Sequence, residues 1–240
     1  MHEELALLLA AMPDEQRVSV GGRDFWQGHW QGQAVVVVLS RIGKVAAAST
    51  AALLIERHRV DAVIFTGVAG GLAEQVQVGD AVVSTEFLQH DLDASPLFER
   101  HVIPLDGISR IPADPVWGER LRQAAQHAQA RLQADWPQGW QGLDLGRARV
   151  HQGLIVSGDR FVSTTAESQA LQCSLPDALA VEMEGAAVAQ VCLDYGVPFA
   201  AVRTVSDRAD DEAHTDFNRF IRDVASRYSL AILSQWLMHR

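Results

Sequence analysis

Two glutamates stand close together in an otherwise apolar part of the sequence. The stretch "AVEMEGAAVAQV", residues 180–191, places Glu182 and Glu184 on either side of Met183. Ionised carboxylates are costly to bury unless a cation or a set of hydrogen-bond donors pairs with them. Acids at these positions therefore require a partner, which can be a polar ligand or a neighbouring side chain.

Further polar residues follow apolar runs that read as strands. The run "DAVIFTG" leads into the glycine-rich residues 67–71, "GLIVSGD" precedes Phe161, and "PFAAVRTVSD" carries Arg203, Ser206 and Asp207. In doubly wound folds, ligands collect at the carboxyl ends of strands. Glycines, an aromatic ring, a thioether and several carboxylates at such ends suit a small polar ligand with a flat ring.

Each of these residues also has a purely structural interpretation. Phe161 can belong to the core, Glu184 can act on a helix dipole, and Asp207 can cap the turn that follows it. The glycines of "TGVAGG" can simply form a tight turn. They do not make a P-loop, since no Gly-Lys-Ser/Thr follows, and they do not make a clean GxGxxG motif.

Other catalytic classes find little support. "HDLD", residues 90–93, offers possible metal ligands, but nothing nearby completes a set, so we expect neither a metal nor an organic cofactor. Cys173 and Cys192 form no CxxC pair and lack the electropositive neighbours of a nucleophilic thiol. A GxSxG nucleophile elbow is absent from the sequence.

The composition is that of an ordinary globular protein. The chain has 240 residues, a formal net charge of −10 and 48% apolar residues. The negative charge argues against a broad electrostatic contact with nucleic acid or with an anionic membrane. The apolar runs, such as Ala34–Leu39, are far too short to span a bilayer, and the acidic "MHEE" start is unlike a signal peptide. We therefore expect a cytoplasmic protein.

The order of the predicted elements indicates an α/β fold. Alternating residues between Arg17 and Ser40 predict an antiparallel meander. Apolar runs that begin at residues 61, 79, 150, 178 and 198 predict further strands. Helices are predicted at 3–11, 43–59, 115–135, 185–195 and 215–236. We expect residues 1–240 to form one domain, a three-layer α/β/α arrangement around a central mixed sheet.

In combination, the motifs "TGVAGGL", "SGDRF", "VEMEGAA" and "RTVSDRAD" resemble those of the 5′-methylthioadenosine/S-adenosylhomocysteine nucleosidases. That family belongs to the purine nucleoside phosphorylase and uridine phosphorylase superfamily. The resemblance extends from "MHEEL" through "SRIGKVAAA" to "HTDFNRFI" and is weakest between about residues 97 and 147. It implies a nucleoside phosphorylase-like fold and hydrolysis of the bond between adenine and a 5′-thio-substituted ribose.

The resemblance also implies roles for individual residues. Asp207, oriented by Ser206, would protonate the leaving adenine, which requires a raised pKa. Glu184 would accept hydrogen bonds from the ribose hydroxyls and offset the charge of an oxocarbenium-like sugar. Met183 would pack on the ribose. Phe161 would stack on adenine, and the backbone of Val162 would bind the edge of the base.

The nucleophile implied by the resemblance is water. Glu4 and Arg203 match the glutamate and arginine that hold it in the family. The family's serine in the glycine turn is replaced by Val68, which cannot hydrogen-bond through its side chain. The remaining implied substrate contacts are Ala69, Gly70, Ile42 and Phe217.

Two further expectations follow from the resemblance. Members of the family have a short hydrophobic strand before the segment that matches "MHEEL", so either the sequence lacks part of its N-terminus or, as we expect, the sheet is built without this usual first strand. Glu4 would then lie close to a chain terminus. The nucleosidases are homodimers, and the loop His90–Phe98 matches the region that reaches the partner's site, through Leu97 or Phe98.

Alternative functions remain open at this point. A phosphorylase would use phosphate in place of water, and the adjacent acids Glu3 and Glu4 disfavour it, although Arg41 and Arg203 could serve it. A hydrolase of another 6-substituted purine nucleoside, such as futalosine, would need the same leaving-group chemistry. A non-catalytic purine-binding module on the same fold would explain Val68, but it would have no use for an acid such as Asp207.

Overall fold

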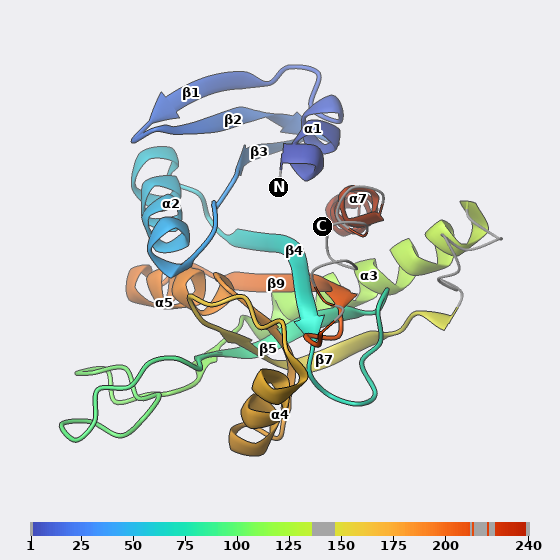
Figure 1. Ribbon diagram of the computed structural model, residues 1–240. Helices are drawn as coiled ribbons and strands as arrows, with labels where there is room; N and C mark the ends of the chain where they lie inside the picture. The colour runs from blue at the N-terminus through green and yellow to red at the C-terminus, as the bar shows by residue number, and fades with distance from the viewer. Residues whose placement is uncertain (1, 136–146, 212, 214–219, 221–223, 239–240) are drawn as a thin grey trace.

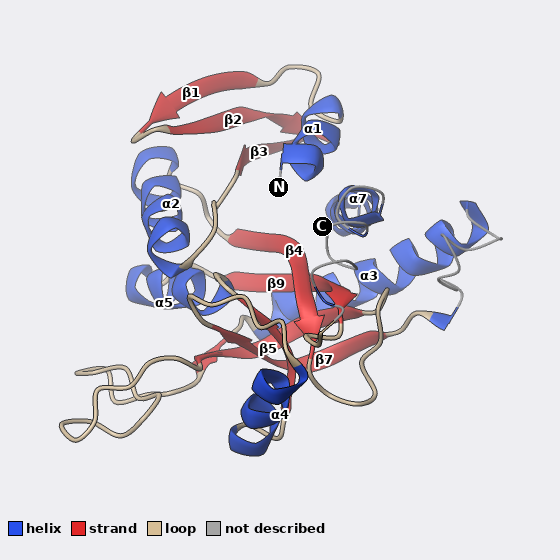
Figure 2. Cartoon of the chain, in the orientation of Figure 1, coloured by secondary structure: helices blue, strands red, loops and turns tan. Residues whose placement is uncertain are grey.

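The computed structural model describes residues 2–135, 147–211, 213, 220 and 224–238. The helices are α1 (His2–Ala10), α2 (Lys44–His58), α3 (Pro115–Asp135), α4 (Thr165–Ser174), α5 (Gly185–Tyr195) and α7 (Ser226–Met238). The strands are β1 (Gln16–Val20), β2 (Arg23–Trp30), β3 (Gln33–Val38), β4 (Val63–Gly71), β5 (Ala81–Gln89), β6 (Ile111–Pro112), β7 (Val150–Ser157), β8 (Ala178–Glu182) and β9 (Phe199–Asp207). Figure 2 shows how they alternate along the chain.

The N-terminal strands form an antiparallel sheet of their own. β2 pairs with β1 on one side and with β3 on the other, as the alternating sequence predicts. Phe25 and Trp30 are the buried residues of β2, so the apolar face of the meander packs inward. The tight connections at Gly21-Gly22 and Gln31-Gly32 use left-handed backbone conformations, which suit glycine.

The central sheet is mixed, as expected, and its two sides meet. Its strand order is β6-β5-β7-β8-β4-β9, and β5 also pairs with β9. The five strands β5, β7, β8, β4 and β9 therefore form a closed ring. The pairs β5–β7, β7–β8 and β4–β9 are parallel, whereas β4–β8 and β5–β9 are antiparallel. The expectation of an α/β fold around a central mixed sheet is confirmed.

Helices cover both faces of this sheet (Figure 1). One apolar core joins α2 and α5 to strand residues that include Val82 and Ala201. A second core joins α1, α3 and α7 to their sequence neighbours Val83 and Val202. Successive residues of a strand point to opposite faces, so the two cores lie on opposite sides of the sheet. This explains why β9 is apolar at nearly every position up to Arg203.

β3 and β4 each leave one edge unpaired. Among the described residues, β3 pairs only with β2. β4 pairs with β9 over Val63–Gly70, and only its last two residues, Gly70 and Gly71, also pair with β8. A cavity of about 710 Å³ is lined by residues of both strands, together with Leu5 and Leu8 of α1 and Trp236 of α7. In the part of the chain that the structure describes, the meander therefore does not join the central sheet through strand pairing.

Several element boundaries differ from the sequence predictions. β8 ends at Glu182, so Met183 and Glu184 lie beyond the strand, because the chain turns there into α5. The last helix is described from Ser226, and most of the predicted residues 215–225 lie outside the described part of the chain. The sequence analysis missed β6 and α4. Helix α4 carried a usable signal: Thr164 accepts a hydrogen bond from the amide of Glu167, as in a Thr-x-x-Glu capping box.

Candidate active site

Strand pairing brings the predicted site residues together. Gly70 of β4 lies opposite Asp207 of β9 and opposite Val181 of β8. Ser157 of β7 lies opposite Glu182. The end of β4 therefore lies between the ends of β8 and β9, and the carboxyl ends of β7 and β8 adjoin.

Asp207 is buried at the end of β9, with 1% of its surface exposed. Its Oδ2 accepts a hydrogen bond of 2.7 Å from the Ser206 hydroxyl, and its Oδ1 accepts one of 2.9 Å from the amide of Ala209. A Cβ atom added to Gly70 would lie only 2.9 Å from Oδ1. The glycine of "TGVAGG" therefore allows the close approach of this carboxyl group to β4.

Glu184 occupies the N-cap position of α5, but its side chain does not cap the helix. Its Oε1 accepts a hydrogen bond of 3.0 Å from the amide of Gly43, which lies just before α2. Burial, and then the negative charge of Glu182, raise the pKa of Glu184 to about 7, against the opposing effects of the Gly43 amide and Arg203. This carboxyl group can therefore change protonation state near neutral pH.

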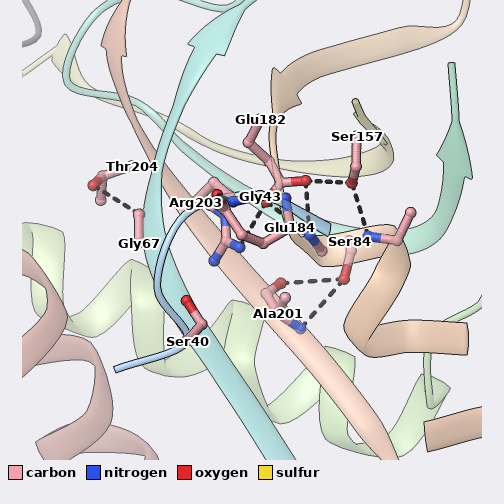
Figure 3. A network of polar contacts seen from close by, with 12 residues as sticks. Ser40, Gly43, Gly67, Ser84, Ser157, Glu182, Glu184, Ala201, Arg203 and Thr204 are labelled. Carbon is pink, nitrogen blue, oxygen red and sulfur yellow. Dashed lines mark hydrogen bonds and ion pairs between the residues drawn. The ribbon is translucent and has the colours of Figure 1, made fainter. Parts of the chain in front are cut away.

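Glu182 provides the cap that Glu184 does not (Figure 3). Its carboxylate accepts hydrogen bonds from the amides of Glu184 and Gly185, at 3.1 Å and as short as 2.8 Å. It also accepts one from the Ser157 hydroxyl. That hydroxyl in turn accepts a bond of 2.7 Å from the amide of Ala186, so both side chains satisfy amides at the start of α5.

Arg203 is the largest fully buried side chain in the described part of the protein. Its Nη2 donates to Oε2 of Glu182 at 2.8 Å, and these two side chains are 1% and 2% exposed. Its guanidinium carbon lies 4.0 Å from the ring centre of Phe65. The Nε and Nη1 atoms have no hydrogen-bond partner among the described residues. Arg203 therefore has donors left over for a ligand or a water molecule.

The other predicted contact residues have mixed environments. Phe161 is 38% exposed, so it is not a core residue, whereas Val162 is buried in a small core with Leu88 and Leu154. Met183 is half-buried beside Glu182, and Ala69 is buried at the end of β4. Ile42 is 70% exposed on the loop that leads to Gly43. Val68 is half-buried and packs against the core formed by α1, α3 and α7.

The structure does not describe the side chains of two predicted site residues. Glu4 lies in α1, but its side chain is outside the described part of the chain, and Phe217 lies outside it entirely. The positions of their side chains relative to Asp207 and Glu184 therefore remain predictions.

The sequence analysis overlooked a second group of contacts beside Glu184. The amide of Lys44 donates to Asp159 at 2.7 Å, and its ammonium group donates to Asp91 at 2.6 Å. Asp91 also accepts a bond of 2.8 Å from the amide of Asp159. Burial opposes the charge on Asp91, but the bonds from Lys44 and Asp159 outweigh it and lower the pKa of this carboxyl group. These contacts fasten the start of α2 and the loop His90–Phe98 to the end of β7.

Within the described ranges, no three His, Cys, Asp or Glu side chains are grouped so as to hold a metal ion. In the same part of the chain, no helix is both long and apolar enough to cross a membrane. The large cavity between β3 and β4 is lined by neither Asp207 nor Glu184, so it is separate from the carboxylates at the strand ends.

A closed mixed barrel with buried acids at its strand ends defines a protein of the phosphorylase superfamily, whose family model matches residues 1–237. A 5′-methylthioadenosine/S-adenosylhomocysteine nucleosidase of Shewanella sp. (strain W3-18-1) is 36% identical over 240 residues, which cover 100% of this chain and 96% of the relative. The chain belongs to the family of these nucleosidases.

Solved structures agree with this placement. The nucleosidase of Neisseria meningitidis, in complex with methylthio-immucillin-A, superposes with a TM-score of 0.86 and 35% identity, covering 99% of this chain and 95% of that one. A futalosine hydrolase mutant of Helicobacter pylori superposes with a TM-score of 0.85 at 28% identity, covering 100% of this chain and 96% of the other. Both expected hydrolase types thus occur among proteins with this fold.

Proposed function

We propose that this protein hydrolyses the N-glycosidic bond of 5′-methylthioadenosine and S-adenosylhomocysteine, releasing adenine and the 5′-thio-substituted ribose. The observation that carries the proposal is a pair of carboxyl groups, Asp207 at the end of β9 and Glu184 just beyond the end of β8, each of which accepts hydrogen bonds that fix it. Membership of the nucleosidase family supports the same reaction.

In the proposed reaction, Asp207 gives its proton to adenine. Adenine is a poor leaving group as an anion, and protonation allows it to depart as a neutral base. The Ser206 hydroxyl and the Ala209 amide each donate a hydrogen bond to the Asp207 carboxyl group and fix its position at the end of β9. This fixed position supports Asp207 as the group that meets the base.

Glu184 is proposed to act on the sugar. Loss of adenine leaves positive charge on the ribose ring, and a carboxylate beneath the ring stabilises it. The bond from Gly43 fixes one carboxylate oxygen of Glu184 and leaves lone pairs for ribose hydroxyls. Met183 would contact the ribose, and the exposed ring of Phe161 would stack on adenine beside the backbone of Val162.

Water is the proposed nucleophile, held by Glu4 and Arg203. The unpartnered Nε and Nη1 atoms of Arg203 support a role for this residue in binding an oxygen atom. Val68 cannot contribute a hydrogen bond, so the proposed water site depends on fewer groups than the family pattern implies. Ile42, Ala69, Gly70 and Phe217 complete the proposed substrate contacts.

We further propose that residues 1–240 act as one domain in a cytoplasmic homodimer. Leu97 is 84% exposed and Phe98 is 37% exposed on the loop His90–Phe98. An apolar loop tip of this kind supports a contact with a second copy of the chain, close to the proposed substrate site of that copy. We propose no metal, cofactor, nucleic acid or membrane as a partner.

A substrate panel tests the proposed reaction. We expect adenine release from 5′-methylthioadenosine and S-adenosylhomocysteine at equal rates with and without added phosphate, measured by chromatography. A strict requirement for phosphate would instead assign a phosphorylase. Futalosine belongs in the same panel because a hydrolase of that compound shares the fold. Release of base from futalosine alone would move the assignment to that substrate.

A further inference from the structure

The role of Glu182 can be inferred from its contacts. We propose that Glu182 is a positioning residue, which holds Arg203 and the main chain of Glu184 in place for catalysis without touching the substrate itself. This inference rests on the proposed function, because it concerns the same site.

The Glu182 carboxylate collects donors from three different elements (Figure 3). The Ser157 hydroxyl comes from the end of β7, the Glu184 and Gly185 amides come from the start of α5, and the Arg203 guanidinium comes from β9. A carboxylate has about four lone-pair directions, so these donors use essentially all of its capacity. With 2% of its side chain exposed, Glu182 has no oxygen left to offer a ligand.

Two of those donors belong to residues of the proposed mechanism. The bond from the amide of Glu184 fixes the peptide that carries the proposed ribose-binding carboxylate. The ion pair with Arg203 fixes the guanidinium against the ring of Phe65. Arg203 keeps Nε and Nη1 without a partner, so Glu182 orients the group while leaving donors available. If the Glu182–Arg203 ion pair served stability alone, hydrogen-bond partners at Nε and Nη1 of Arg203 would stabilise the fold further.

Glu182 also acts on Glu184 through its charge. Glu182 and Arg203 both influence Glu184 through their charges, and their effects on its pKa are opposite. The negative charge of Glu182 raises the pKa of Glu184, so a neutral residue at position 182 would lower it. The proposed mechanism requires Glu184 as a carboxylate, and the acidic limb of the activity profile would therefore move to lower pH.

Two substitutions separate these effects. Glu182→Gln removes the charge and replaces one acceptor oxygen with an NH2 donor, so the side chain can no longer accept from donors at both of its ends. Glu182→Asp keeps the negative charge, but its side chain is one methylene shorter, so the carboxylate lies farther from Arg203. The control is Glu86→Gln, which breaks the 2.8 Å ion pair of Glu86 with Arg110, outside the site. For each variant, kcat and KM for 5′-methylthioadenosine are measured from pH 5 to 9, with circular dichroism as a check of folding.

We expect both variants at position 182 to lower kcat by about 10- to 100-fold, a loss typical of small misplacements of catalytic groups, with a much smaller change in KM. Only Glu182→Gln should move the acidic limb to lower pH, and Glu86→Gln should change neither quantity. An unmoved limb in a folded Glu182→Gln protein overturns the inference. If that variant does not fold, a normal kcat in Glu182→Asp overturns it instead. Failure of the unaltered protein to release adenine would count against the proposed function itself.

Discussion

The amide of Gly43 donates a hydrogen bond of 3.0 Å to Oε1 of Glu184, although 141 positions separate the two residues in the sequence. This contact joins the start of α2 to the start of α5, and the two helices pack in the same apolar core, which also contains Val82 and Ala201. The proposed ribose-binding carboxylate is thus fixed by the framework of the fold. Its protonation can be tested directly.

Activity should depend on the ionisation of Glu184. Because burial and the charge of Glu182 raise its pKa to about 7, a large fraction of Glu184 is neutral below that pH. The proposed mechanism needs the carboxylate, so kcat/KM, which reports ionisation of the free protein, should rise with pH through about 7. Adenine release at low substrate concentration, measured from pH 5 to 8 in one series of buffers, checks this. A kcat/KM that stays flat across the range would exclude Glu184 as the group that must be ionised.

The ionisation of Glu184 should also change the free energy of unfolding with pH, in a direction that its pKa determines. The pKa of Glu184 is about 7 in the folded chain and about 4.5 without the fold. The folded state therefore binds more protons between those values, and Glu184 makes the protein less stable as pH rises from 4.5 to 7. Glu184→Gln removes this effect, so the variant should gain about 3 kcal/mol at most relative to the unaltered protein between pH 4 and 8. Urea denaturation at both pH values measures the difference, and Glu74→Gln serves as an exposed control.

Asp207→Asn should abolish most turnover and leave the fold intact. An amide has the shape of the carboxyl group, can accept from the Ala209 amide through its oxygen and can donate to the Ser206 hydroxyl oxygen, but it cannot act as a general acid toward adenine. General-acid catalysis contributes about 10²- to 10⁴-fold, and we expect a loss of that size in kcat. Asp106→Asn makes the same change at an exposed position and should alter neither kcat nor the fold. Near-normal adenine release by Asp207→Asn would remove the proposed acid.

The fold was predictable to the extent that local pattern decides it. The predicted bounds of α3 and α5 match the structure, because amphipathic spacing and flanking residues mark their ends. The closure of the sheet through β5 and β9 was not predictable, since it depends on the pairing of residues such as Val82 and Arg203, far apart in the sequence. Short-range alternation carries no information about such pairs.

The site was predictable in its residue types and much less so in its contacts. Glu182, Glu184 and Asp207 stood out because acids are rare in apolar runs. The partners of these acids did not stand out: Ser157 is one serine among many, and Gly43 acts through its main chain. Main-chain donors have no signature in the sequence, so a residue that serves through its amide is found only in a structure.

Gly185 should tolerate no side chain. A Cβ atom at this position would lie 2.6 Å from the ring of Phe87 and 3.1 Å from a carboxylate oxygen of Glu182. Gly185→Ala should therefore destabilise the protein by about 1–3 kcal/mol through overpacking, and it should lower kcat by disturbing Glu182. Gly118→Ala in α3 is the matched control, because its Cβ would meet only the carbonyl of Ser84 at 3.7 Å. That change should be neutral or stabilising. Equal melting temperatures for the two variants would contradict the packing argument.

The two unpaired edges of β3 and β4 lead to a prediction about the N-terminus. α1 begins beside the cavity between these strands, and Leu5 and Leu8 contribute to its lining. β3 and the first half of β4 are apolar runs of the kind found in strands covered on both faces, yet most of their residues are only half-buried.

An apolar segment of about six residues, added before Met1 with a short turn, could pair with both edges and fill the cavity. We expect the extended chain to melt at a higher temperature, because the added segment would bury apolar surface in the cavity. The control carries a Gly/Ser segment of the same length, which cannot fill an apolar cavity. Equal melting temperatures for the two extended chains would show that the cavity does not accept a strand.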